Sequence, residues 1–152
     1  MAVHLRGVTT VLLPGTGSDH EFVQRAFSAA LHDVGASVLT PPPQPHRLVE
    51  AYREDLDHAA RAAAPMPIAV GGVSIGAAVA AAWALSHPHR VVAVLAALPA
   101  WTGAPEAAPA ALAARYSAEL LRRDGLVAAT AQMQASTPNW LAEELTRSWA
   151  GQ

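Results

Sequence analysis

Short apolar runs divide the first hundred residues at regular intervals. They are rich in β-branched residues, each is followed by glycine or proline, and they cover residues 8–13, 36–40, 67–71 and 90–98. Continuous apolar runs of this length predict strands that are buried on both faces of a sheet.

The segments between these runs have apolar residues at three- and four-residue spacing, the period of a helix with one buried face. They predict helices over residues 19–35, 46–64 and 76–87. Ser18 and Glu21 have the spacing of a capping box, so the first helix is expected to begin near Asp19. Alternating strands and helices predict an α/β fold, with a parallel sheet of about four strands and helices on both faces.

The pattern changes after Pro99. Helices are predicted over residues 105–123, 126–135 and 137–149, and no strand is predicted beyond residue 98. Asp124-Gly125 ends the first of these helices, and Thr137-Pro138 begins the last. We therefore expect an α/β part over residues 1–100 and a helical part over residues 101–152.

Composition removes several classes of protein. The 152 residues are 52% hydrophobic with a net charge of −2, which excludes a disordered chain, and ten arginines against twelve acids make no basic patch for a nucleic acid. There is no cysteine for a disulfide or a metal-binding thiolate. Because residues 1–10 lack a signal-peptide core and no uninterrupted apolar stretch would span a bilayer, we expect a cytoplasmic protein without a membrane partner.

Residues 72–76 have the sequence Gly-Val-Ser-Ile-Gly, which matches G-x-S-x-G. The motif lies directly after a predicted strand and directly before a predicted helix, the setting of a nucleophile elbow. Such a turn projects the serine hydroxyl from the carboxyl edge of the sheet, and its glycines let helix and strand approach closely. The alternative is an ordinary tight turn in which Ser74 caps the helix.

Residues 14–18, Pro-Gly-Thr-Gly-Ser, follow the first predicted strand and are expected at the same edge of the sheet. The amide of Thr16 or Gly17 could join that of Ile75 to form an oxyanion hole. The alternative is a glycine-rich turn with no role in catalysis.

The chain resembles the α/β-hydrolase family of serine hydrolases over these two segments. VLLPGTGSDHEF resembles the family's oxyanion strand and loop, and IAVGGVSIGAAVAAAWALSHPHRVVAVLAALP resembles its strand, elbow, helix and next strand. The resemblance implies that residues 1–100 are a partial hydrolase core and residues 101–152 a helical cap. It also implies that Ser74 is the nucleophile, with oxyanion donors at Ile75 and at Thr16 or Gly17.

The family places an acid and then a histidine after the nucleophile, and this chain does not. Only His87 and His89 follow Ser74, and both precede the next acid, Glu106. The chain is therefore expected to stop before the catalytic acid and histidine of the family. A serine without a base is a weak nucleophile, so activity of this chain alone should be low or absent.

Other residues offer partial substitutes. His20, oriented by Asp19, could lie near Ser74, although an exposed histidine at a helix start is the favoured interpretation; His46 is a weaker candidate. Trp101, with Trp140, Trp149 and Met133, could line an apolar acyl pocket or could simply pack helices.

Motifs for cofactors and metals are missing. Residues 15–20 lack the third glycine of a dinucleotide fingerprint, a P-loop needs a lysine that the chain does not have, and His58 with Asp55 or Asp57 makes no metal set. We therefore expect no cofactor and no metal. The predicted function is a serine hydrolase acting through Ser74 on a small ester, thioester or similar acyl substrate. The alternative is a non-catalytic α/β domain that binds a small molecule or pairs with a second subunit, as a homodimer through an exposed sheet edge.

Overall fold

A computed structural model describes residues 4–100, 104, 106 and 108–150. The chain divides into two compact units, residues 1–99 and 100–152, which are described separately below.

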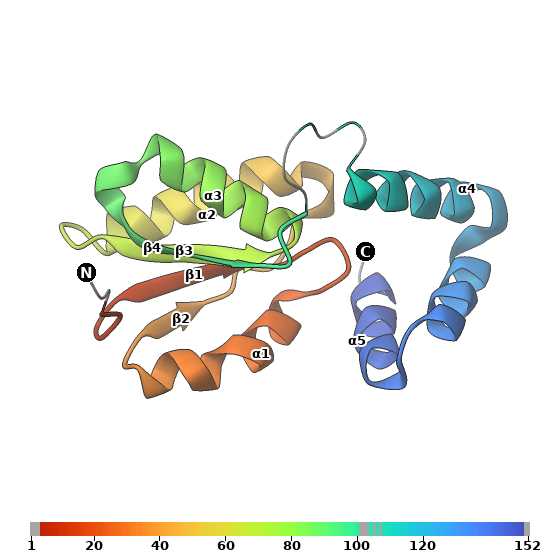
Figure 1. Ribbon diagram of the computed structural model, residues 1–152, viewed down its shortest axis with the longest axis horizontal. Helices are drawn as coiled ribbons and strands as arrows, with labels where there is room; N and C mark the ends of the chain where they lie inside the picture. The colour runs from red at the N-terminus through yellow and green to blue at the C-terminus, as the bar shows by residue number, and fades with distance from the viewer. Residues whose placement is uncertain (1–3, 101–103, 105, 107, 151–152) are drawn as a thin grey trace. The chain divides into compact units, whose positions relative to one another are not determined.

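The first unit is built on a four-stranded parallel sheet (Figure 1). Its strands are β1 (Thr9–Leu13), β2 (Ser37–Leu39), β3 (Ile68–Val73) and β4 (Val91–Ala97), in the order β2-β1-β3-β4. Each strand lies within a residue or two of the predicted run. The prediction of a parallel sheet of about four strands is confirmed.

Helices cover both faces of this sheet, as predicted. Their bounds are α1 (His20–Asp33), α2 (Leu48–Ala62) and α3 (Ile75–Ser86), with 3-10 turns η1 (Pro45–Arg47) and η2 (Pro88–Arg90). Figure 1 shows α2 and α3 on one face and α1 on the other. The second helix was predicted to begin at residue 46, but Pro45 starts a 3-10 turn there and α2 begins at Leu48.

Alternation along β1 supplies both layers of the core. Val11 and Leu13 pack with Tyr52, Leu56 and other residues of the cluster beneath α2 and α3, whereas Leu12 packs with Val23 and Leu31 of α1. All of these side chains are buried. Because successive residues of a strand point to opposite faces, one five-residue strand anchors helices on both sides.

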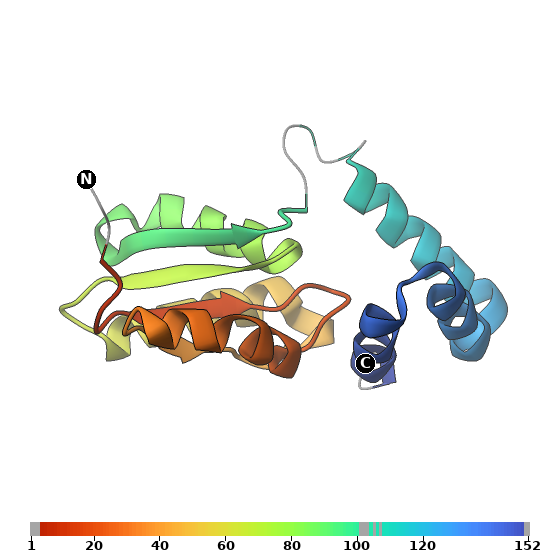
Figure 2. The ribbon, with the colours of Figure 1, turned by 60° about the horizontal axis from the view of Figure 1, so that its bottom comes forward.

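The outer strands are less buried than the sequence predicted. β1 and β3 are enclosed, but β2 and β4 are only partly covered, and the Val94 side chain of β4 is 45% exposed. An apolar run predicts a strand well, but it does not reveal whether that strand lies at the centre or the edge of the sheet. Figure 2 shows β4 along the outer edge of the sheet.

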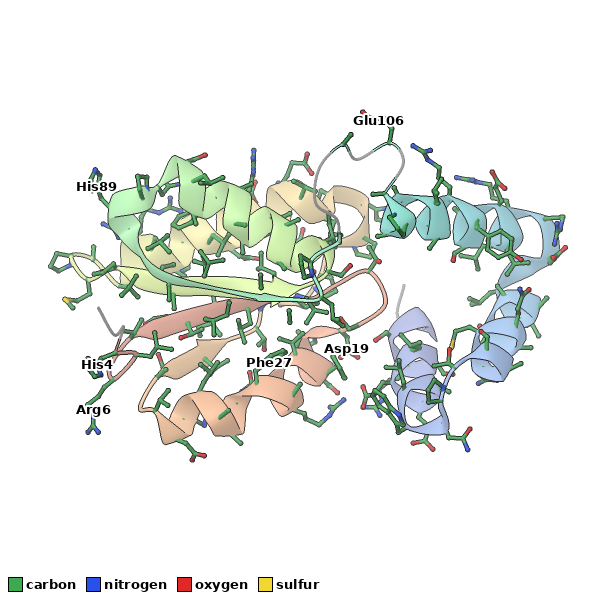
Figure 3. The ribbon with its side chains drawn as sticks, viewed as in Figure 1. His4, Arg6, Asp19, Phe27, His89 and Glu106 are labelled. Atoms are coloured by element: carbon green, nitrogen blue, oxygen red, sulfur yellow. The ribbon has the colours of Figure 1, made fainter. Side chains whose placement is uncertain are left out.

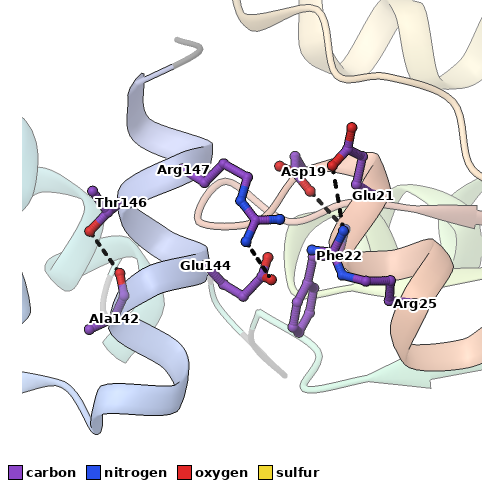
Figure 4. A network of polar contacts seen from close by, with 8 residues as sticks. All are labelled: Asp19, Glu21, Phe22, Arg25, Ala142, Glu144, Thr146 and Arg147. Atoms are coloured by element: carbon purple, nitrogen blue, oxygen red, sulfur yellow. Dashed lines mark hydrogen bonds and ion pairs between the residues drawn. The ribbon is translucent and has the colours of Figure 1, made fainter.

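The start of α1 corrects the predicted capping box. Asp19, not Ser18, is the N-cap, and its carboxylate accepts a hydrogen bond of 2.7 Å from the Phe22 amide (Figure 4). Ser18 is not available for this role, because its hydroxyl accepts a hydrogen bond of 3.1 Å from the Gly15 amide. Glu21 instead pairs with Arg25 one turn on, at 3.5 Å.

Replacing Asp19 by alanine should lower the free energy of unfolding by about 1 kcal/mol, the usual cost of losing an N-cap. Urea denaturation followed by circular dichroism measures this change. Asp33→Ala is the matched control, because Asp33 is at the opposite end of α1, where a carboxylate is unfavourable to the helix dipole. A loss of stability in the control as large as in Asp19→Ala would contradict this account of the cap.

The second unit is helical. α4 (Pro109–Ser136) is interrupted at Gly125, whose φ of 79° and ψ of 171° are not helical, and α5 (Asn139–Ala150) follows. The predicted break at Asp124-Gly125 is therefore a kink between two helical halves.

Polar contacts form within α5 and between α5 and α4. In α5, Arg147 pairs with Glu144 at 3.2 Å, and the Thr146 hydroxyl donates to the Ala142 carbonyl at 2.7 Å (Figure 4). Gln134 of α4 donates to the Thr146 hydroxyl at 3.0 Å. In the described part of the chain, no helix is both long enough and apolar enough to cross a membrane.

Candidate active site

Ser74 occupies the single residue between β3 and α3. Its φ of 53° and ψ of −116° lie in a region that residues with a side chain rarely adopt, at a cost of roughly 1–3 kcal/mol. The Ser74 amide donates to the Ala97 carbonyl at 3.0 Å, which fastens the turn to the end of β4. Strain of this kind is often found where a side chain must be presented in one orientation.

The glycines on both sides of Ser74 make the turn possible. A Cβ atom on Gly76 would lie 2.2 Å from the Leu13 carbonyl oxygen and 2.6 Å from that of Pro14, and one on Gly72 would lie 2.3 Å from the Leu13 oxygen. The first turn of α3 thus lies directly against the end of β1. The G-x-S-x-G motif places a glycine, which has only a hydrogen atom in place of a side chain, at both points of contact.

The Ser74 hydroxyl does not cap α3. Its side chain makes no capping hydrogen bond, so the alternative of a helix-capping serine is wrong. No hydrogen bond joins this hydroxyl to any other residue that the structure describes. The Ser74 carbonyl accepts from the Ala78 amide at 3.2 Å, which leaves the amides of the first turn, from Ile75 onward, without an acceptor in the helix.

The loop of residues 14–18 lies beside Ser74. A Cβ atom on Gly15 would lie 3.2 Å from the Ser74 Cβ and 3.2 Å from the Val73 carbonyl oxygen. Within the loop, the Gly15 amide donates to the Ser18 hydroxyl, and the Ser18 amide donates to the Gly15 carbonyl at 3.4 Å. The loop is therefore a compact turn packed against the backbone of the candidate nucleophile.

Two candidate oxyanion donors belong to this loop. Thr16 is exposed and Gly17 is half-buried. The Gly17 amide has no acceptor within the described part of the chain, whereas Thr16 already makes a polar contact. Both residues therefore remain candidates to join the Ile75 amide.

A residue that the sequence did not single out fastens the loop from below. The Tyr52 hydroxyl, on α2, donates to the Pro14 carbonyl at 3.0 Å. The sequence predicted Tyr52 only as a core position of an amphipathic helix. A buried tyrosine needs a partner for its hydroxyl, and that requirement was the available signal.

The candidate histidines do not complete the site. His20 is the first residue of α1, but the hydrogen bond of Asp19 goes to Phe22, so the expected orientation of His20 by Asp19 is not observed. His46 lies exposed in η1. Trp101 lies outside the described residues.

The histidines after Ser74 lie at the far end of α3. His87 caps the helix C-terminus with its ring stacked on Trp83, and Figure 3 shows His89 at the end of the sheet opposite Asp19. A twelve-residue helix spans about 18 Å, so neither histidine can reach Ser74. Among the described residues, no cluster of three histidine or carboxylate side chains could hold a metal ion.

Comparison with known proteins supports the architecture. No family model and no curated protein matches the chain. Among solved structures, it is similar to a monoacylglycerol lipase from Paleococcus ferrophilus, with 16% identity and a TM-score of 0.53, over 95% of this chain and 68% of that one. At this identity the likeness concerns the fold alone: a four-stranded parallel sheet with a helical C-terminal segment, consistent with part of an α/β-hydrolase fold.

Proposed function

We propose that this chain is a serine hydrolase of the α/β-hydrolase type. The observation that carries the proposal is the strained backbone of Ser74, with a φ of 53°, at a strand-to-helix turn packed against the loop of residues 14–18. An ordinary tight turn does not need a serine in this conformation. The strain is explained if the hydroxyl must be presented to a substrate.

The geometry supports attack by the Ser74 Oγ on the carbonyl carbon of an acyl substrate. A bond from Oγ to that carbon forms, the bond to the leaving alcohol or thiol breaks, and the serine proton passes to the leaving group. The amides of Ile75 and of Gly17 or Thr16 would hold the negative charge on the carbonyl oxygen, assisted by the N-terminus of α3. Water then releases the acyl group and regenerates Ser74.

A general base for Ser74 is not found among the described residues. No histidine or carboxylate that the structure describes is hydrogen-bonded to Ser74, so turnover by this chain alone is proposed to be slow or absent. In this proposal, residues 1–100 form the nucleophile part of a hydrolase core and residues 101–152 form a cap.

The proposed substrate is a small ester, thioester or related acyl compound, handled in the cytoplasm without a metal or cofactor. The similar solved structure is that of a monoacylglycerol lipase, which supports an ester. A partner nucleic acid is not proposed, because the arginines are balanced by acids.

Labelling with a fluorophosphonate tests this function. Serine attack on phosphorus expels fluoride and leaves a stable adduct, so labelling that is slow for want of a base still accumulates at high reagent concentration and long incubation. We expect peptide mass spectrometry to find the adduct on the segment that contains Ser74. An unlabelled chain, or an adduct on another serine only, would overturn the proposal.

A second candidate function is subunit pairing without catalysis, favoured by the open edge of β4. This seven-residue strand has no charge and no proline, the usual devices against edge-to-edge association, and its Val94 side chain is 45% exposed. A second copy could pair along β4 and extend the sheet.

Size-exclusion chromatography with light scattering tests pairing. If copies associate through β4, the parent chain is expected to be a dimer and Val94→Lys a monomer, because a charge on the strand opposes its pairing. Val127→Lys, at an exposed position of α4, is the control and should remain a dimer. A monomeric parent chain at all concentrations would exclude this candidate.

A further inference from the structure

Tyr52 has an unusual place in the first unit. Its side chain is fully buried (0% exposed) in the cluster beneath α2 and α3, yet its hydroxyl donates to the carbonyl of Pro14, 38 residues earlier in the chain. Pro14 begins the loop that packs against Ser74. A core side chain therefore reaches the backbone of the candidate oxyanion loop.

The hydrogen bond acts on one peptide unit. The Pro14 carbonyl and the Gly15 amide belong to the same planar group and, in a trans peptide, point in opposite directions. Tyr52 donates to the carbonyl at 3.0 Å, and the Ser18 hydroxyl accepts from the amide at 3.1 Å. With both ends of the group bonded, its plane cannot rotate without breaking one bond.

This peptide unit sets the direction of the following residues. Gly15 lies against both Ser74 and the Val73 carbonyl, so rotation of the peptide would move the loop relative to the nucleophile. Thr16 and Gly17, the two candidate donors, come directly after it. Their amide positions depend on the orientation that Tyr52 and Ser18 hold.

The chemistry of the phenol suits a permanent bond. Burial, and to a smaller extent the nearby Asp55 carboxylate, raise the pKa of Tyr52 above its ordinary value. The hydroxyl therefore keeps its proton, and remains a donor, at every pH at which the protein would work. Without it, a buried carbonyl would lose its partner.

We propose that Tyr52 is a positioning residue of the oxyanion hole, which acts with Ser18 by fixing the Pro14–Gly15 peptide and thereby the amides of Thr16 and Gly17. The inference rests on the proposed serine hydrolase function. It assigns to α2, which contributes no candidate catalytic group, a part in arranging the site.

The experiment compares Tyr52→Phe and Ser18→Ala with the parent chain. Each removes one bond of the same peptide and almost no volume, and Ser18→Ala tests the inference even if Tyr52→Phe folds poorly. Trp83→Phe is the control, because it removes another buried donor, the indole that donates to Asp57 at 2.8 Å, away from the loop. All variants are measured well below their melting temperatures.

Two readouts separate positioning from stability. Hydrogen exchange of a peptide that covers residues 14–18 should become faster in Tyr52→Phe and Ser18→Ala but not in Trp83→Phe. The rate constant of fluorophosphonate labelling at Ser74 should fall roughly tenfold or more in the first two variants and stay unchanged in the control.

The outcomes distinguish the inference from the function on which it rests. If the parent chain is labelled and both loop variants react as fast as it does, the positioning role is wrong and the hydrolase proposal stands. If labelling falls equally in Trp83→Phe, the effect comes from general loosening, and the positioning role is also wrong. If the parent is not labelled at Ser74, the proposed function is wrong. The inference that rests on it is then wrong as well, regardless of the hydrogen-exchange rate of residues 14–18.

Discussion

Gly76→Ala should destabilise the first unit by roughly 3 kcal/mol or more, and we expect little folded protein. In most helices this change stabilises, because alanine is the better helix former by about 1 kcal/mol. Here the added methyl carbon would lie 2.2 Å from the Leu13 carbonyl oxygen and 2.6 Å from that of Pro14. Both are backbone atoms of the central strand and its loop, so no side-chain rotation relieves the overlap.

Gly7→Ala is the control for this prediction. Gly7 has a φ of 73° and nothing within 4 Å of an added Cβ, so alanine costs only the backbone penalty of about 1–2 kcal/mol. Denaturant unfolding of both variants, with the yield of soluble protein, gives the comparison. Equal stabilities would mean that α3 can move away from β1 without loss, contrary to the contact described here.

Ser74→Gly and Ser74→Ala should both abolish fluorophosphonate labelling, but only the first should stabilise the fold. Neither variant has the hydroxyl that attacks phosphorus. Glycine adopts a φ of 53° without strain, whereas alanine keeps its Cβ and the strain with it. After the entropy cost of glycine, we expect Ser74→Gly to gain on the order of 1 kcal/mol, and Ser74→Ala to gain little.

Calorimetry or denaturant unfolding of the two variants measures the stability difference, and labelling under identical conditions measures the chemistry. The two variants separate two properties of Ser74, its strained backbone and its reactive hydroxyl. A strained backbone at a serine is explained if the side chain is used. Continued labelling of the Ser74→Ala variant would mean that another residue is the nucleophile. A Ser74→Gly variant less stable than Ser74→Ala would remove the argument from strain.

The sequence predicted the layers of the first unit because their signals are local. A run such as residues 8–13, ended by Pro14, specifies a strand without reference to distant residues. The G-x-S-x-G turn was equally accessible, because the spacing of the motif is itself local, although Gly72 and Gly76 are required by contacts with the distant end of β1. Gly125 likewise marked the break in α4.

Long-range features escaped prediction. The hydrogen bond from Tyr52 to Pro14 joins residues far apart in the chain, and no spacing rule connects them. The partial exposure of β4 depends on its place at the sheet edge, which an apolar run does not encode. Ser18 and Asp19 are both good helix caps, and the choice between them was decided by the Gly15 amide, which bonds to the Ser18 hydroxyl.

The glycine contacts around the turn have a consequence for engineering. Gly71, Gly72 and Gly76 meet the backbone carbonyls of Leu95 and Leu13 directly, so the place of Ser74 depends on main chain against main chain and little on how side chains fill the core. A mutagenesis library that leaves these three codons intact could vary neighbouring core positions widely and still present the serine in the same way. New substrate preferences could then be selected on an unchanged reactive centre.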